Sequence, residues 1–411
     1  MKDRQNEIDR RDFLKTIGAA GLTSALAQVT KAKPNETGNA EKQKPEYPQV
    51  PRRKLGKTGV MVPCLSLGAA FDIVENQIVL RKALDWGVNY WDSAHNYAGG
   101  NSELGIGKFL SKNSKLRKKL FIVTKASIFG ETITAKKVQE RFELSLKRMN
   151  TDYIDLYCGV HGLSNPDDLT DELKQWAENA KKQKLIRFFG FSTHNNMAKC
   201  LAAAARLDWI DVVMTSYNFR LMQDEQLQAA IDACHKAGIG LIAMKTQAHK
   251  IETEEDKELT KHFLQRGFTE GQAKVKIVLE DKRFSSACVG RNNVAHLMLN
   301  IAAALDKTKL TQADKDFFKQ YAQTTCSGYC AGCADICRSA LPEVPYVNDI
   351  LRYLMYCNSY GDKGGARELF AQIPAAVRGK LLSTDYRFAE ARCPQHLPIG
   401  KLISQAVSKL A

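Results

Sequence analysis

The sequence lacks the features of several large classes of protein. None of its apolar runs reaches about 18 residues, the minimum for a membrane-spanning helix, so we expect no membrane span. It contains no arginine-rich arm, no zinc-finger spacing and no basic region followed by heptads, so nothing indicates nucleic-acid binding. The formal net charge is +15, but the basic residues are spread along the chain, which is typical of a solvated surface.

The hydrophobic content is that of a globular protein. Hydrophobic residues make up 44% of the 411 residues and charged residues 26%, which excludes disorder of the whole chain. This length indicates two or three domains, or one large barrel with additions.

The first residues have the order of features found in an export signal. Arg10-Arg11 precedes Phe13-Leu14-Lys15, a weakly apolar stretch follows over residues 16–27, and Ala25-Leu26-Ala27 has the small-x-small form of a cleavage site. This resembles a twin-arginine signal peptide; the alternative is an amphipathic surface helix. The resemblance implies periplasmic or other export by the twin-arginine machinery, which carries proteins that are already folded. We therefore expect a signal peptide at 1–32 and a proline-rich linker at 33–51.

From residue 61 onward, short apolar segments alternate with longer amphipathic ones. Eight short segments are rich in β-branched and aromatic residues, which is typical of buried parallel strands. The predicted strands are residues 62–69, 88–94, 120–126, 154–160, 186–192, 212–218, 240–245 and 286–290. Among the segments between them, residues 135–149, 171–182, 197–207 and 225–237 have helical periodicity.

Eight such units predict a (β/α)8 TIM barrel, an α/β fold. The rival is an open doubly wound sheet, but no Gly-x-Gly-x-x-Gly turn follows a strand here.

Catalytic residues of such barrels lie at the carboxyl ends of the strands, so candidate catalytic side chains are expected there. Four side chains stand at or just after three successive strand ends: Asp92, Tyr97, Lys125 and His161. Each of these four residues taken alone has an ordinary structural explanation. Four such side chains at three successive strand ends are unlikely to occur by chance.

Several motifs around these residues occur together in one enzyme family. They are Arg53-Lys54-Leu55-Gly56-Lys57-Thr58-Gly59, Asp92-Ser93-Ala94 with Tyr97, Ser102-Glu103 with Gly105, Leu146-Lys147-Arg148-Met149, Thr151-Asp152-Tyr153-Ile154-Asp155-Leu156, Gly190-Phe191-Ser192, Tyr217-Asn218, and Gly290 with Asn300. In combination they resemble the aldo-keto reductase family over residues 52–305.

The resemblance implies reduction of an aldehyde or ketone by hydride transfer, or oxidation of the alcohol. Tyr97 would donate the proton, and Lys125 would lower the pKa of the phenol from about 10 towards the working range. Asp92 would hold Lys125 as an ion pair, and His161 would polarise the carbonyl oxygen. The hydride would come from a bound nicotinamide.

The resemblance also places a cofactor site, with departures from the family pattern. Thr193 stands where Asn is common, Met214 where Gln is usual, and His296 where Arg or Gln often stands. A phosphate would suit the helix start at Gly290-Arg291-Asn292, which favours NADPH, with NADH as the alternative. Solvated surface charge is the competing explanation for Arg291 and Lys245. The expected cofactor residues are Ser192, Thr193, Tyr217, Lys245, Gly290, Arg291, Asn292, His296 and Asn300.

Residues 306–411 form a predicted small, mainly helical domain that contains cysteines. Cys326, Cys330, Cys333 and Cys337, followed by Cys393-Pro394, resemble a ferredoxin cysteine run whose first gap is one residue longer. The simplest reading is one [4Fe–4S] cluster on Cys326, Cys330, Cys333 and Cys393, with Cys337 as the alternative to Cys393. Structural zinc and disulfides formed after export are the competing interpretations.

Three functions therefore remain open. The first is an exported reductase with a small carbonyl or alcohol substrate. The second is a redox-relay enzyme, in which an Fe–S group exchanges electrons with a redox partner and recycles a tightly held cofactor. The third is a non-catalytic nucleotide-binding sensor, against which the retention of Asp92, Tyr97, Lys125 and His161 argues.

Overall fold

Eight parallel strands close into a barrel in the order β10-β3-β4-β5-β6-β7-β8-β9. The structure is a computed structural model that describes residues 47–128, 131–248, 253–290 and 293–411. The barrel strands are β3 (Leu65–Gly68), β4 (Tyr90–Asp92), β5 (Phe121–Lys125), β6 (Ile154–His161), β7 (Ile186–Thr193), β8 (Val212–Ser216), β9 (Gly240–Met244) and β10 (Phe284–Val289). The predicted (β/α)8 barrel is confirmed. The proposed signal peptide at 1–32 lies outside the described residues, as does most of the proposed linker.

The first predicted strand, residues 62–69, is in fact two strands. Its first part belongs to an antiparallel hairpin of β1 (Arg52–Lys54) and β2 (Met61–Pro63), and only its second part is β3 in the barrel. Pro63 has no N–H and ends the hairpin pairing. Cys64 then bends the chain, and its N–H donates to the Pro51 carbonyl at 2.7 Å.

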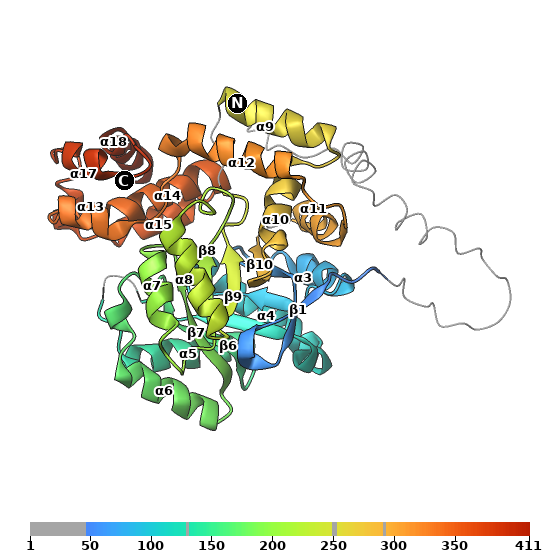
Figure 1. Cartoon of the computed structure of the whole chain (residues 1–411). Helices are drawn as coiled ribbons and strands as arrows, with labels where there is room; N and C mark the ends of the chain where they lie inside the picture. The colour runs from blue at the N-terminus through green and yellow to red at the C-terminus, as the bar shows by residue number, and fades with distance from the viewer. Residues whose placement is uncertain (1–46, 129–130, 249–252, 291–292) are drawn as a thin grey trace.

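Helices surround the barrel (Figure 1). They are α3 (Gln77–Asp85), α4 (Asn101–Lys112), α5 (Ala135–Met149), α6 (Asp171–Lys182), α7 (Met197–Ala204), α8 (Glu225–Lys236), α9 (Glu254–Gln265), α10 (Glu270–Glu280) and α11 (Val294–Leu305). Side-chain caps fix several starts: the hydroxyls of Thr134 and Thr170 accept from the backbone N–H groups of Lys137 and Leu173. Short 3-10 turns complete the barrel: η1 (Gly56–Thr58), η2 (Tyr97–Gly100), η3 (Ser114–Lys119) and η4 (Pro166–Asp168).

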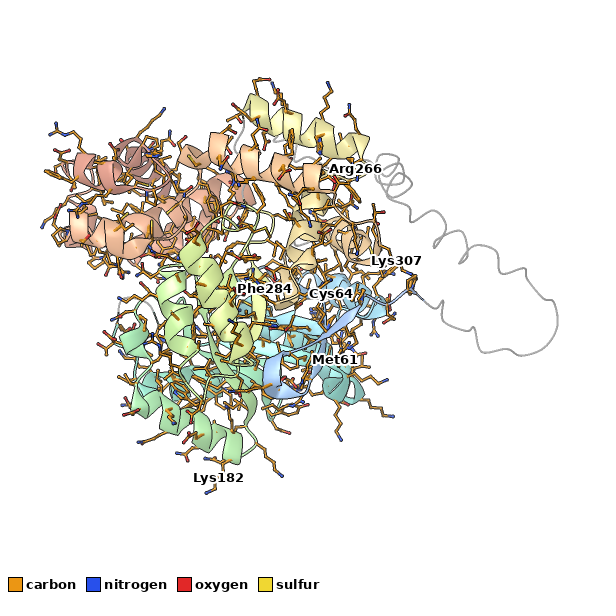
Figure 2. The ribbon with its side chains drawn as sticks, viewed as in Figure 1. Met61, Cys64, Lys182, Arg266, Phe284 and Lys307 are labelled. Carbon is orange, nitrogen blue, oxygen red and sulfur yellow. The ribbon has the colours of Figure 1, made fainter. Side chains whose placement is uncertain are left out.

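The side chains drawn in Figure 2 separate into a filled interior and a charged periphery. Phe284 of β10 is almost fully buried, whereas Lys182 ends α6 at the outer edge of the molecule. Among the described residues, none of the helices is long and apolar enough to cross a membrane.

The chain after α11 is helical, as predicted. Its elements are α12 (Gln312–Thr324), η5 (Cys326–Gly328), α13 (Ala334–Ala340), α14 (Val347–Tyr360), α15 (Lys363–Ala371), α16 (Ala375–Arg378), α17 (Arg387–Arg392) and α18 (Ile399–Leu410). The apolar core of the barrel continues into α12 through Phe318 and Tyr321. A second core starts at Cys337 and extends to Leu410. The domain boundary proposed after residue 305 thus coincides with the end of α11. The second apolar core begins later in the chain, at Cys337.

Polar contacts dock the C-terminal domain onto the carboxyl edge of the barrel. The Asn195 amide donates to Asp349 of α14 at 3.0 Å, and Arg338 of α13 donates to Ser164 at 2.8 Å. Gly332 has a φ of +82°, and a Cβ there would lie 2.2 Å from the backbone oxygen of His194. Only glycine allows this approach, so the docking is specified by the sequence.

Candidate active site

The ends of β4, β5 and β6 place three of the four predicted catalytic side chains beside one another. Lys125 Nζ lies 2.7 Å from Asp92 Oδ2 and 2.6 Å from the Ser93 carbonyl oxygen. Tyr97 begins the η2 turn after β4, and its ring centroid lies 4.9 Å from Lys125 Nζ and 5.6 Å from the ring of His161. The barrel register therefore brings together the four residues that the sequence singled out.

The ion pair between Lys125 and Asp92 is shielded from water. Their side chains are 1% and 4% exposed. Burial is the largest single influence on the pKa of Lys125 and lowers it, but Asp92, Tyr97 and Cys158 together outweigh burial, so the pKa is raised and the ammonium persists at neutral pH. Asp92 thus keeps a full positive charge close to the Tyr97 ring.

Tyr97 remains a protonated phenol. Burial raises its pKa to about 12, even though the Lys125 ammonium acts in the opposite direction. The expectation that Lys125 would bring this pKa below 10 is therefore wrong for the net shift, because loss of water outweighs the ammonium. A protonated phenol is the form that can donate a proton to a developing alkoxide.

His161 is a neutral imidazole held by a residue that the sequence analysis missed. Burial lowers its pKa well below the usual value, and the Lys125 ammonium adds to the effect. Ser127 Oγ lies 2.6 Å from His161 Nδ1 and 2.6 Å from Asn96 Oδ1. The hydroxyl has one proton, so it donates to only one of these atoms. When it donates to Nδ1, the imidazole carries its proton on Nε2 and can donate it to a carbonyl oxygen.

His194 is a second residue that the motifs did not indicate. It follows the end of β7, and its Nδ1 lies 3.0 Å from Ser216 Oγ at the end of β8. Burial lowers its pKa well below the usual value, and the charge of Arg352 contributes. One feature of the sequence could have indicated Ser127 and His194. Both residues come just after a strand that ends in a predicted site residue.

The predicted cofactor residues are divided between the two sides of the barrel mouth. Ser192 is paired with His161 in the β6–β7 ladder, so a group bound there would adjoin the catalytic cluster. At the opposite side, the Gln247 amide donates to Asn300 of α11 at 2.8 Å and joins that helix to the loop after β9. Gly290 directly follows β10, and the side-chain oxygen of Asn293 accepts from the backbone N–H of His296 at 2.9 Å. Arg291 and Asn292 lie outside the described residues.

Three of the predicted cofactor side chains have hydrogen-bond partners within the chain. The Tyr217 ring stacks on Phe284 with centroids 4.3 Å apart, and its hydroxyl donates to Asp281 Oδ2 at 2.7 Å. Both partners lie at the amino end of β10, so the structure does not bring Tyr217 to the catalytic cluster. The Thr193 hydroxyl is held by the carbonyl oxygens of Leu163 and Asn195. The Ser192 hydroxyl likewise accepts from the backbone N–H of Gly162 at 3.1 Å, so the hydroxyls of Ser192, Thr193 and Tyr217 all have partners within the chain.

A model described as the aldo/keto reductase family matches residues 66–312. The chain belongs to the aldo/keto reductase family. It is accordingly an NAD(P)H-dependent oxidoreductase by class.

Individual relatives are distant. L-galactose dehydrogenase of Arabidopsis thaliana is 24% identical over 285 residues, which are 63% of this chain and 89% of that protein. Aldo-keto reductase AFTS1 of Alternaria alternata is 24% identical over 233 residues, which are 46% of this chain and 63% of that protein. An aldo-keto reductase structure from Bacillus halodurans, in its holo form, is 21% identical with a TM-score of 0.56. It covers 66% of this chain and 96% of its own, and at this identity it supports the fold alone.

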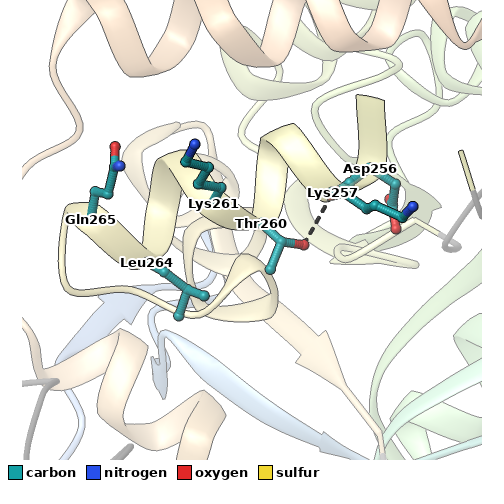
Figure 3. A pocket seen from close by; sticks show the side chains of 6 residues that line it. All are labelled: Asp256, Lys257, Thr260, Lys261, Leu264 and Gln265. Carbon is teal, nitrogen blue, oxygen red and sulfur yellow. Dashed lines mark hydrogen bonds between the residues drawn. The ribbon is translucent and has the colours of Figure 1, made fainter. Parts of the chain in front are cut away.

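This aldo/keto reductase has a cavity between the mouth of its barrel and its C-terminal domain. The cavity has a volume of about 290 Å³ and is lined by His194, Ser216 and Lys245 from the barrel and by Asn348, Arg352 and Tyr360 from α14. A larger hollow of about 550 Å³ runs along α9 (Figure 3), where Asp256, Lys257, Thr260, Lys261, Leu264 and Gln265 line it. None of the predicted site residues lines that hollow, so we place function at the barrel mouth.

The predicted metal ligands are not assembled into a metal site. Within the described residues, no three His, Cys, Asp or Glu side chains are arranged to hold a metal ion, and the eleven cysteines are free thiols. Cys326 follows Thr325, which accepts from Arg220 on the barrel side, whereas Cys337 and Cys393 are buried in the second apolar core. Within the described residues, Cys326 belongs to neither apolar core, whereas Cys330 packs against the second core. Cys330, Cys333, Cys337 and Cys393 are electrostatic neighbours of one another.

Proposed function

We propose that this protein reduces an aldehyde or a ketone with NADPH, or oxidises the corresponding alcohol, with Tyr97 as the proton donor. The observation that carries the proposal is the placement of the protonated Tyr97 phenol between the Lys125 ammonium and the neutral His161 imidazole.

The residues divide the work on the carbonyl oxygen. A bound nicotinamide supplies the hydride to the carbonyl carbon. As negative charge develops on the oxygen, Tyr97 donates its proton, and the Lys125 ammonium stabilises the phenolate that forms. Asp92 holds that ammonium through the 2.7 Å contact. His161 donates from Nε2 to the same oxygen in the tautomer in which the Ser127 hydroxyl gives its one proton to Nδ1 rather than to Asn96 Oδ1.

Ser192, Gly290 and Asn300 would hold the cofactor. Ser192 offers a hydroxyl beside His161 for the nicotinamide carboxamide, and Asn300 lies at the far side of the mouth. The preference for NADPH over NADH rests on Arg291, whose guanidinium would pair with the additional phosphate.

The test is a fluorescence titration of the purified chain with NADPH and NADH, followed by turnover of an aldehyde panel. We expect NADPH to bind more tightly and to be oxidised only when an aldehyde is present. Absence of NADPH binding would contradict the proposal. Binding without turnover of any aldehyde or ketone would favour the sensor function instead.

We further propose that the protein is exported by the twin-arginine route. The support is the order Arg10-Arg11, Phe13-Leu14-Lys15 and Ala25-Leu26-Ala27 in the sequence. Replacement of both arginines by lysine should retain the protein in the cytoplasm when cell fractions are compared. Equal export of the variant and the wild type would refute this.

A metal centre in the C-terminal domain is a third proposal, and it is independent of the reduction step. It is supported by the cysteine spacing and by the packing of α13 against α17, which brings Cys333, Cys337 and Cys393 into mutual electrostatic reach. The lack of a metal-binding arrangement in the described chain opposes it. Iron, zinc and sulfide analysis of anaerobically purified protein decides the question, and Cys393→Ser should abolish any metal that is found.

A further inference from the structure

The cavity at the barrel mouth carries excess positive charge. Lys245 and Arg352 line it, and no Asp or Glu does. Lys245 Nζ lies 4.2 Å from the ring centroid of Tyr356 and 4.8 Å from that of Tyr360, and its main electrostatic neighbours among the described residues are the phenols of Tyr356, Tyr360 and Tyr97. Aromatic faces attract an ammonium but do not neutralise it.

The guanidinium of Arg352 has more N–H donors than it uses within the protein. One nitrogen of its guanidinium donates to Asp349 Oδ1 at 2.8 Å, and another lies 3.3 Å from Asn195 Oδ1. The Tyr353 hydroxyl is a third partner. A guanidinium has five N–H donors in a planar fork, so these three contacts fix its position and leave further N–H groups for a ligand. The Asp349 carboxylate neutralises one of the two positive charges of Lys245 and Arg352, so the cavity retains one net positive charge.

A buried amide lines the same cavity without a hydrogen bond. Asn348 is 2% exposed, and neither Nδ2 nor Oδ1 has a hydrogen-bond partner among the described residues. An unpaired amide in such a place costs free energy, so it calls for a ligand or an ordered water. Asn348, Arg352 and Tyr356 are four residues apart and therefore share one face of α14, the face that meets the barrel.

The cavity adjoins the catalytic cluster. His194 and Ser216 line it from the ends of β7 and β8, and β7 is paired with the strand that ends in His161. The charge of Lys245 acts on Tyr97, and the charges of Lys245 and Arg352 act on His161. A ligand in the cavity would therefore lie next to the carbonyl that Tyr97 protonates.

We propose that this cavity binds the anionic end of the substrate, with Lys245 and Arg352 holding a carboxylate and Asn348 binding a hydroxyl or carbonyl group beside it. The proposal rests on the proposed reductase function and narrows the substrate class to aldehydes or ketones that carry a carboxylate. The cofactor pyrophosphate is the other anion that this chemistry could hold, and the experiment separates the two.

The experiment compares a matched pair of aldehydes, 4-carboxybenzaldehyde and its methyl ester, with saturating NADPH and the full chain. We expect the wild type to prefer the carboxylate by at least about 10-fold in kcat/KM, since a charged group meets a charge-assisted partner. Arg352→Met should reduce this preference to about one, mainly through the KM of the carboxylate. Arg367→Met removes an exposed arginine of α15 and is the matched control, which should keep the wild-type preference.

Asn348→Leu provides a second readout that a merely structural role would not give. It removes two unpaired buried amide atoms, so the melting temperature should rise while the KM for 4-carboxybenzaldehyde also rises. A lower melting temperature with unchanged KM would count against a ligand role for Asn348.

Other outcomes overturn the proposal or test its foundation. An equal preference in the wild type and Arg352→Met would refute it. A loss of NADPH affinity in Arg352→Met with the aldehyde preference intact would assign the anion site to the pyrophosphate instead. If the wild type reduces neither aldehyde, turnover of the aldehyde panel with NADPH decides whether the reductase function itself fails. Calorimetric binding of 4-carboxybenzaldehyde then tests the site alone: binding that Arg352→Met abolishes supports it, and equal binding by the ester overturns it.

Discussion

The ion pair of Lys125 and Asp92 contributes both to the stability of the fold and to the proposed proton transfer. Two variants separate these contributions. Lys125→Met leaves the Asp92 carboxylate buried without its counter-ion, and we expect a loss of about 3–5 kcal/mol in the free energy of unfolding. The double variant Asp92→Asn with Lys125→Met should regain most of that stability but remain inactive. Urea unfolding and carbonyl turnover measure the two effects. A double variant as unstable as the single one would contradict this account.

The buried histidines predict how stability depends on pH. Burial lowers the pKa of His95 to about 4, and it lowers those of His161 and His194 well below the usual value. An unfolded histidine has a pKa of about 6.5, so the unfolded chain takes up protons first. The stability from these groups is complete above about pH 6.5 and is lost as the pH falls towards 4.

Urea unfolding at pH 7.5, 6.0 and 5.0 measures this dependence. Carboxylates also titrate in acid, so the control is His95→Gln, in which the loss of stability between pH 7.5 and 5.0 should be smaller than in the wild type. An identical loss in both proteins would show that His95 does not contribute.

The sequence located residues whose position the barrel dictates. Asp92, Lys125 and His161 end successive strands, so the fold alone brings them together. It could not locate Arg352 or Asn348, because their place depends on docking between segments such as Asn195 and Asp349, which are 154 residues apart. Ser127 was missed because its role depends on the course of a loop after β5.

At the scale of single elements, α4 shows how glycine sets the position of the site. The helix follows the turn that carries Tyr97, and its Ser102 hydroxyl lies 2.7 Å from that of Ser93 beside the catalytic strand end. A Cβ at Gly107 would lie 2.1 Å from the backbone oxygen of Arg148, so α4 packs against α5 only with glycine there.

Gly107→Ala should therefore destabilise the protein by about 1–3 kcal/mol, the usual cost of overpacking. Gly364→Ala in α15 is the matched control, since no atom lies within 4 Å of the added methyl group. It should be neutral or stabilise the chain by up to about 1 kcal/mol. Thermal unfolding of both variants is sufficient, and equal melting temperatures would show that α4 can shift to accommodate the methyl group.

Helices with a clear amphipathic period were predicted correctly. A side chain whose position depends on residues distant in the sequence was not. The helices at 135–149 and 171–182 were predicted with the observed bounds because strong amphipathic patterns and threonine caps mark them. The segment around Tyr217 was read as a cofactor contact, but its ring packs on Phe284, a contact 67 positions away that no local pattern reveals.

At the scale of the whole molecule, the C-terminal domain distinguishes this chain from the matched reductase structures. The Bacillus halodurans structure is covered almost entirely yet matches only 66% of this chain, and the family model ends at residue 312. The added domain has its own apolar core and places one face of α14 over the barrel mouth. We infer that the barrel supplies the reaction and the domain restricts the substrate.

The most direct test of the central claim is steady-state oxidation of NADPH by the wild type and by Tyr97→Phe, with 4-carboxybenzaldehyde as the substrate. The account predicts turnover by the wild type and a loss in kcat of about 100-fold or more in Tyr97→Phe, because the general acid is removed. The dissociation constant for NADPH should be unchanged. Equal kcat values in the two proteins would show that Tyr97 is not the proton donor and would contradict the account.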